Sequence, residues 1–374
     1  MSENQIPSVL TKPENEMQFS YGGQAVIEGV LMRGANTMAI AVRDPEGRIV
    51  IHEQPLNKHL YRGKIAKTPF VRGIVGLWDA MGLGTRSLMW SADVALGEDE
   101  DDVSFNGPIG FATVAFSLVI GVGLFFFLPT TLATVIGGWL GLTGEAGAAP
   151  IGVNATLINL IEGVIQLTIL IAYIWAIGRM EDVKRLFGYH GAEHKTINAY
   201  EAGAELTPEI VAKYPIEHPR CGTAFLLTVV FVSIFVFSLL GRPPFALLIL
   251  SRVILIPVIA GIAYEFLRFT AKNIENPFIR MIVKPNLALQ HLTTRQPDLD
   301  MIEVAITSFK RVLLSEGLIT EEEAAVPTEL KPQDTTFSRA YREEQAEKKA
   351  KAEAEAPKED APEVEVEEPV TVAE

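Results

Sequence analysis

The sequence has little cysteine, little histidine and no excess of positive charge. A single cysteine, Cys221, excludes an intrachain disulfide and is compatible with a reducing compartment. The formal net charge at pH 7 is -14, and most of it comes from acidic residues in 98–102 and 321–374. The rest of the chain is close to neutral, so we expect no nucleic-acid partner. Residues 1–19 are polar and lack the apolar core of a secretory signal peptide.

Long apolar stretches are what the sequence does have. Hydrophobic residues make up 48% of the chain, and the mean hydropathy is +0.24, which fits a protein that is part membrane-embedded and part soluble. Each of four stretches is long enough to cross a bilayer as a helix. They are residues 109–128, 153–178, 222–241 and 244–269. We expect residues 130–142, which follow Pro129, to form an interfacial or re-entrant continuation of the first span.

Lysine and arginine are concentrated on one side of these spans. They are frequent in residues 58–86, 179–221 and 268–295, whereas the two opposite loops offer only Arg242. By the positive-inside rule, all large polar segments and both termini are cytoplasmic. The sequence thus predicts a multi-pass protein whose partner is the lipid bilayer, with a protein partner or a homo-oligomer left open.

The polar segments differ in their patterns. Short strands are expected near 24–32, 37–44 and 48–54, and helical periodicity over 70–89 suggests either an interfacial or a core helix. Residues 301–313 show helical spacing, and the tail has the composition of a disordered chain. The predicted divisions are a flexible arm (1–20), an α+β segment (21–107), a membrane domain (108–270), a helical segment (271–320) and an acidic tail (321–374). The fold class is therefore mainly α, polytopic, with about four transmembrane helices and a small N-terminal cytoplasmic β-containing segment.

The stretch "GYHGAEHKTINAYE", residues 188–201, contains two of the six histidines. It lacks proline and is expected to be a helix that ends at Gly203. His190 and His194 then lie on one face, one turn apart. His-x-x-Glu-His is the spacing of inverted zincins, whose histidines bind zinc and whose glutamate activates water. This spacing predicts His190 and His194 as metal ligands, zinc as the metal and Glu193 as the catalytic base.

A third ligand must come from elsewhere, and the candidates are Glu265, His218 and Cys221. A closed set of both helix histidines with His218 and Cys221 would be a structural site. Three ligands with an open position and Glu193 nearby would be a catalytic site. A polar loop that binds no metal is the plainer alternative.

A charged residue, Glu162, interrupts the second span. It lies at nearly the same depth as Arg252 of the fourth span, counted at about 1.5 Å per residue. An unpaired charge there costs about 2.5–3.5 kcal/mol, so we expect Glu162 and Arg252 to pair. Asn159 and Gln166 are placed to complete the cluster. An ion pair that fixes helix register is favoured over a transport role.

The glycine-rich stretch "GGQAVIEGVLMRG" places Glu28 and Arg33 among small residues. Glycines permit close backbone approach, so these two side chains could line a ligand pocket. A tight turn that packs against the membrane domain is equally consistent with this pattern.

Several long motifs occur together in one order and resemble the YqhQ-like family of bacterial membrane proteins, whose domain is of unknown function (1385). They are "GGQAVIEGVLMRG", "GRMEDVKRLFGYHGAEHKTINAYE", "HPRCGTAFLL", "AGIAYEFLRF" and "LTTRQPD". The resemblance covers roughly residues 20–315. It implies a multi-pass protein of the bacterial inner membrane and a predicted metal-dependent enzyme.

Three functions follow from these observations. The first is a metal-dependent hydrolase, most simply a zinc enzyme, with its site on the cytoplasmic side of the membrane. The second is a non-enzymatic assembly or scaffold protein whose loop is held by a structural metal or by hydrogen bonds. The third is a small-solute transporter that uses Glu162.

Overall fold

The computed structural model describes residues 21–61, 63–96, 108–144, 148–149 and 152–325. They all belong to one compact unit, Met1–Thr336, and the second unit is Phe337–Glu374. The expected flexible arm and nearly all of the expected disordered tail lie outside the described residues.

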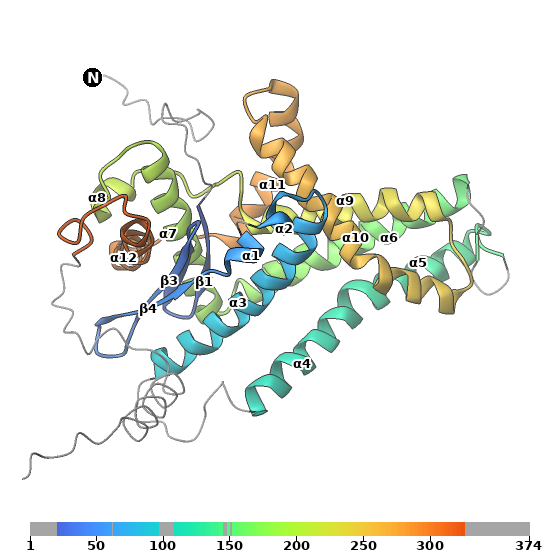
Figure 1. The fold of residues 1–374 in the computed structure, drawn as a ribbon. Helices are drawn as coiled ribbons and strands as arrows, with labels where there is room; N and C mark the ends of the chain where they lie inside the picture. Colours follow the sequence, from blue (N-terminus) through green and yellow to red (C-terminus); the bar gives the residue numbers. More distant parts are fainter. Residues whose placement is uncertain (1–20, 62, 97–107, 145–147, 150–151, 326–374) are drawn as a thin grey trace, which may run out of the picture. The chain divides into compact units, whose positions relative to one another are not determined.

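The described chain is mostly helical with one small antiparallel sheet, whose strands follow in chain order (Figure 1). The strands are β1 (Gly22–Val26), β2 (Gly29–Arg33), β3 (Thr37–Arg43) and β4 (Ile49–Pro55). The helices before the apolar region are α1 (Lys58–Tyr61), α2 (Lys64–Lys67) and α3 (Val71–Leu96). The later elements are α4 (Pro108–Val122), the π-helical turn η1 (Gly123–Phe127), α5 (Leu128–Trp139), α6 (Val153–Ile177), α7 (Glu181–Glu201), α8 (Pro208–Val211), α9 (Gly222–Leu240), α10 (Phe245–Lys272), α11 (Pro277–Thr293) and α12 (Leu299–Ser315).

The first expected strand, 24–32, is in fact a hairpin. The chain turns at Ile27–Glu28, and Val26 pairs with Gly29 across the turn. Glu28 adopts a left-handed backbone with φ of 50°, which a glutamate rarely does. The alternation of side chains shifts by one residue at the turn, because Val26 and Leu31 pack in one apolar cluster and Val30 packs in the other.

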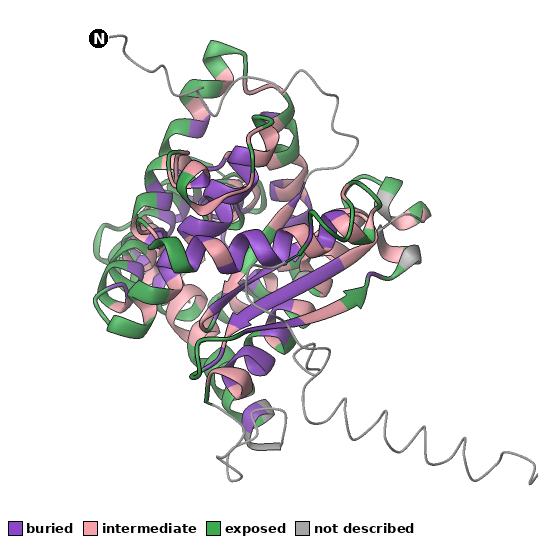
Figure 2. Cartoon of the chain, turned by 90° about the vertical axis from the view of Figure 1, so that its left-hand side faces the viewer, coloured by how far each residue is buried: buried purple, intermediate pink, exposed green. Residues whose placement is uncertain are grey.

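Both faces of the sheet are covered, because successive residues of a strand point to opposite sides. Met38, Ile40 and Val42 of β3 pack with Trp90 of α3 in one apolar cluster. The alternating Ala39 and Ala41 belong to the cluster on the other face, together with side chains of α7 and α12. Figure 2 shows the resulting buried centre of the sheet. The predicted N-terminal segment, histidine loop and C-terminal helical segment therefore share one hydrophobic core.

Four helices are long and apolar enough to cross a membrane: Ala112–Trp139, Val153–Ile177, Gly222–Leu240 and Phe245–Lys272. The first joins α4, η1 and α5 into one helix, so the expected continuation of the first span is helical and runs through Pro129. In a regular helix the N–H of residue 129 would bind the carbonyl of Phe125, and proline has no N–H. Gln166 of α6 replaces it, with Nε2 donating to the Phe125 carbonyl at 3.1 Å.

Helix α3 combines the two alternatives considered for residues 70–89. Its C-terminal half contributes Trp90 to the core of the sheet. Its N-terminal half packs on α10, where Gly73 lies against Tyr264. Between them Trp78 is 79% exposed. The helix thus connects the sheet with the apolar helices and keeps an exposed apolar side chain.

Candidate metal centre

Two glycines allow α7 to pack closely enough to position its histidines. A Cβ atom on Gly188 would lie 2.8 Å from the Met301 sulfur of α12, and one on Gly191 would overlap the carbonyl oxygen of Arg295. These glycines are three residues apart and so lie on one side of the helix. Gly188 lets α12 approach α7, and Gly191 lets the 293–297 segment approach, which includes the Thr293 carbonyl that orients His190.

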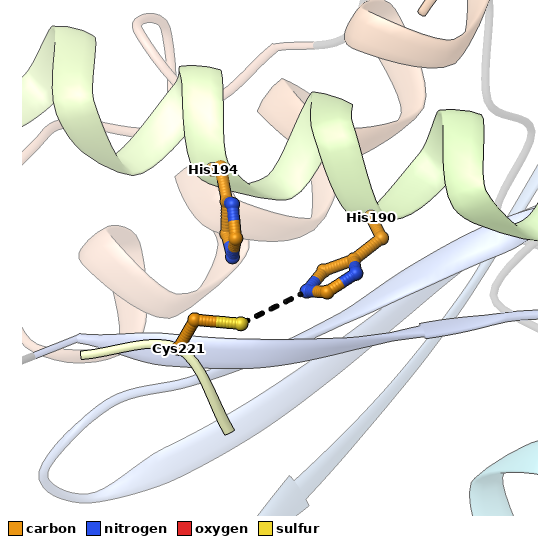
Figure 3. A group of neighbouring side chains, drawn as sticks. All are labelled: His190, His194 and Cys221. Atoms are coloured by element: carbon orange, nitrogen blue, oxygen red, sulfur yellow. Dashed lines mark hydrogen bonds between the residues drawn. The ribbon is translucent and has the colours of Figure 1, made fainter. Parts of the chain in front are cut away.

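The predicted helix is confirmed, and both histidines point from it toward Cys221 (Figure 3). His190 Nδ1 lies 2.8 Å from the carbonyl oxygen of Thr293, and His194 Nδ1 lies 2.5 Å from that of Ile216. A carbonyl accepts only, so each Nδ1 carries the proton and each Nε2 presents a lone pair. Metal-bound histidines usually have such outer partners, which fix tautomer and ring orientation.

Cys221 completes a compact set of three ligand atoms. It is the N-cap of α9, where its sulfur accepts from the Thr223 N–H at 3.4 Å. The Nε2 atom of His190 lies 3.3 Å from Cys221 Sγ. Zinc bonds of about 2.1 Å to nitrogen and 2.3 Å to sulfur at a tetrahedral angle put such atoms about 3.6 Å apart. One ligand atom each from His190, His194 and Cys221 lie within 4.8 Å of one another.

The surroundings of the Nε2 atom of His194 indicate whether these three residues fit a metal ion. It is buried and has no hydrogen-bond partner in the described part of the chain. Burial lowers the pKa of His194, and the neighbouring Cys221 opposes that effect. A buried neutral imidazole with an unused lone pair is disfavoured unless something binds it. The two imidazoles and the thiol are also donors that zinc prefers.

Glu193, the predicted catalytic base, is next to His194 in the chain but does not belong to the group of three ligand residues. It is buried and accepts a hydrogen bond from the backbone N–H of Gly23 in β1. Burial raises the pKa of Glu193, whereas the charges of His190 and His218 act in the opposite direction. Its carboxylate is therefore kept closer to neutrality than an exposed glutamate would be.

His218 lies next to the group and is held by α11. Its N–H donates to Gln290 Oε1 at 2.9 Å, and its carbonyl accepts from Gln290 Nε2 at 2.8 Å. The ring centroids of His194 and His218 are 5.6 Å apart. Burial lowers the pKa of His218 to about 4, so the ring is neutral at pH 7. Behind it, Arg220 and Glu201 form an ion pair.

Glu265, the other proposed third ligand, does not reach the histidines. Its carboxylate binds the Arg72 guanidinium and accepts from the Phe70 N–H at 3.1 Å. These contacts join the end of α10 to the start of α3. Glu265 is therefore a packing residue between two helices, and its prediction as a ligand is corrected.

Comparison of the sequence with known proteins identifies the family of this chain. The family described as "Protein of unknown function (DUF1385)" matches residues 68–315. The chain belongs to the DUF1385 family. It is 35% identical over 303 residues to "Uncharacterized protein YqhQ" of Bacillus subtilis (strain 168). The aligned region covers 80% of this chain and 94% of the relative. No solved structure matches.

In this DUF1385 chain, Glu28 and Arg33 do not form a common pocket. Glu28 binds Arg185 of α7 through two hydrogen bonds of 2.6 and 2.5 Å, and Tyr189 donates to it at 3.3 Å. Arg33 is half-buried, and its electrostatic neighbours are Tyr264 and Asp79. Glu28 thus locks the strained β1–β2 turn onto the histidine helix, which is the tight-turn alternative.

The structure brings Glu162 and Arg252 together and adds a second arginine that sequence reasoning missed. Arg252 Nε and Nη2 each donate to Glu162 at 2.9 Å. Arg242, from the turn between α9 and α10, donates to the same carboxylate at 2.5 Å. Asn159 accepts from both guanidinium groups, at 2.7 and 3.0 Å. Arg242 is the only lysine or arginine in the sequence of the two loops 140–152 and 241–244, and this isolation was the signal that could have pointed to it.

Proposed function

We propose that this DUF1385 protein is a membrane-anchored metal-dependent hydrolase with zinc at His190, His194 and Cys221. One observation carries the proposal: three soft or borderline donors converge, and a backbone carbonyl orients each imidazole. Catalytic zinc sites use three protein ligands and leave a fourth position open. The positive-inside pattern of the sequence supports a position of this site, and of both termini, on the cytoplasmic side of a bacterial cell membrane.

Glu193 supplies the acid–base chemistry in this proposal. Zinc, when bound at such a site, lowers the pKa of a coordinated water to about 7. The raised pKa of Glu193 suits a group that accepts a proton from water and returns it to a leaving group near neutral pH. The carboxylate must first exchange its hydrogen bond with Gly23 for one with water. His218, neutral and adjacent, can donate to or accept from a bound substrate.

Metal content of the detergent-purified, full-length protein is the direct test. We expect about one zinc per chain by mass spectrometry, and loss of at least nine-tenths of it in the double variant His190→Ala/His194→Ala and in Cys221→Ser. His59→Ala is the matched control, because His59 is an exposed histidine on α1. A protein that takes up no zinc after purification without chelator would overturn the proposal.

A scaffold protein with a structural metal is the second candidate, and the position of His218 favours it. Its ring lies 5.6 Å from that of His194, so a small rotation would make it a fourth ligand and close the site. X-ray absorption of the zinc-loaded protein separates the two candidates. Two imidazoles, one sulfur and one light oxygen indicate the open, catalytic site, whereas three imidazoles and one sulfur indicate the structural site.

Activity provides the second separation. Glu193→Gln should retain zinc in both cases. In the hydrolase it should abolish turnover of whichever ester, amide or phosphate substrate the wild type cleaves. The transporter alternative is not proposed, because Thr130, Arg242 and Arg252 all bind the Glu162 carboxylate and hold it in place.

A further inference from the structure

The buried polar cluster among the apolar helices has more positive than negative charge. With Glu162 ionised, its one carboxylate faces the guanidinium groups of Arg242 and Arg252, whose side chains are 0% and 4% exposed. No other carboxylate of the described residues contacts either arginine. Each arginine remains charged under all ordinary conditions. Within the described part of the chain, the cluster therefore has one positive charge without a negative partner, and such a charge is strongly disfavoured in a buried, low-dielectric region.

The same cluster has hydrogen-bond donors without acceptors. Asn159 Nδ2 and Arg242 Nε are buried and have no partner among the described residues. Asn159 is 2% exposed and lines a small cavity of about 10 Å³ together with Arg252, Gln166 and Ser233. A buried donor is normally satisfied by protein, water or ligand. An acceptor that also has a negative charge would satisfy both requirements at once.

A larger cavity of about 120 Å³ adjoins this polar end. Glu162, Gln166, Ser233, Phe237 and Arg252 line both cavities. The remainder of its wall is apolar and comes from several helices, with Leu77, Phe126, Phe225 and Ile256 among the lining residues. Mostly apolar walls with a few polar groups at one end are typical of sites for amphiphilic ligands.

We propose that this cavity binds an anionic single-chain amphiphile of the fatty-acid type. The ligand's carboxylate would lie against Arg252, where its negative charge would compensate the extra positive charge. It would also accept a hydrogen bond from Asn159. The acyl chain would run along the apolar wall formed by α3, η1, α9 and α10. An inorganic anion would use the charge and leave the apolar volume empty, and a neutral lipid would do the reverse. The amphiphile is the ligand class that uses both features.

Binding of radiolabelled dodecanoate to the full-length protein tests the proposal. The measurement is made at pH 8 in a neutral maltoside detergent, with sodium gluconate as the salt. We expect saturable binding of about one dodecanoate per chain. Dodecanol should compete at least tenfold more weakly, because it has the chain without the charge. Replacing gluconate by chloride should leave the dodecanoate affinity within about twofold.

Two variants address the two ends of the site separately. Arg252→Met leaves Glu162 in a neutral pair with Arg242, so the fold should be retained while dodecanoate binds at least tenfold more weakly. Ala260→Phe fills the apolar wall without touching a charge and should weaken binding to a similar extent. Val258→Phe is the matched control, since Val258 lies on the same helix and is 47% exposed. It should bind dodecanoate like the wild type.

Several outcomes would overturn the inference. Equal competition by dodecanol would reduce the site to an apolar cavity, and displacement of dodecanoate by chloride would identify a small-anion site. Dodecanoate binding by Arg252→Met as tight as by the wild type would show that binding does not depend on the charge of Arg252. Glu145, in the loop before α6, lies outside the described residues and is the remaining acidic group of that loop. Tighter dodecanoate binding in Glu145→Gln would show that the chain itself compensates the charge.

Discussion

Gly191 of α7 lies directly against the carbonyl oxygen of Arg295, with no room for a methyl group between them. This contact sets the distance between the helix that carries His190 and His194 and the segment that contains Thr293. Thr293 in turn accepts the hydrogen bond that orients His190. The geometry of the candidate metal centre therefore depends on Gly191, a residue without a side chain.

Gly191→Ala tests that dependence. The added methyl group should push the 293–297 segment away, destabilise the protein by about 1–3 kcal/mol, as overpacking does, and reduce zinc affinity at least tenfold. Gly222→Ala is the control, because nothing lies within 4 Å of a Cβ atom there although it follows Cys221 directly. Thermal unfolding and zinc titration measure the two effects. Unchanged zinc affinity in Gly191→Ala would show that the site does not need this close packing.

Removal of the metal should lower stability. A ligand that binds only the folded state stabilises it by about 2.7 kcal/mol when its free concentration is 100 times Kd. We expect chelator to lower the Tm of the wild type by several degrees and zinc to restore it. The variant His190→Ala/His194→Ala should melt at one temperature with either addition. If zinc changed the Tm of the variant and of the wild type equally, zinc would act at a site other than the two histidines.

His218 should make the metal-free protein acid-sensitive. Its pKa in the folded state is about 4, below the unfolded value of about 6.5. The unfolded state therefore binds more protons between these values, and stability falls as the pH falls from about 6.5 to 4, by roughly 3 kcal/mol. His194, whose pKa burial also lowers, contributes in the same direction. His218→Gln should flatten the dependence of Tm on pH in chelator, whereas the exposed control His59→Gln should not.

Glu162→Gln should be the most destabilising change in the apolar helices. It leaves two buried guanidinium groups without a carboxylate, and breaking a buried pair in this way costs about 3–5 kcal/mol. Glu265→Gln is the comparison, since the Arg72–Glu265 pair is partly exposed and such pairs contribute about 0–1 kcal/mol. Unfolding in detergent measures both. Similar small losses in the two variants would mean that the Glu162 cluster is hydrated.

Local patterns predicted much of this molecule. Length and composition were enough for four apolar helices, because a helix that crosses a bilayer needs only about 20 apolar residues. The spacing of His190 and His194 was enough to place both on one helix face, because that geometry is set within one turn. The form of the continuation after Pro129 stayed open, because the group that replaces the missing N–H of Pro129, Gln166, comes from another helix.

The sequence by itself determined the spans, the histidine helix and the need for a partner at Glu162. Only the tertiary structure decided that Cys221 rather than Glu265 joins the histidines, and that Arg242 joins Arg252. It also decided that three separate segments share one core. The physical reason is the range of the interactions: spacing fixes neighbours within a few residues, whereas contacts between distant segments depend on how close glycines such as Gly188 and Gly191 allow the backbones to come.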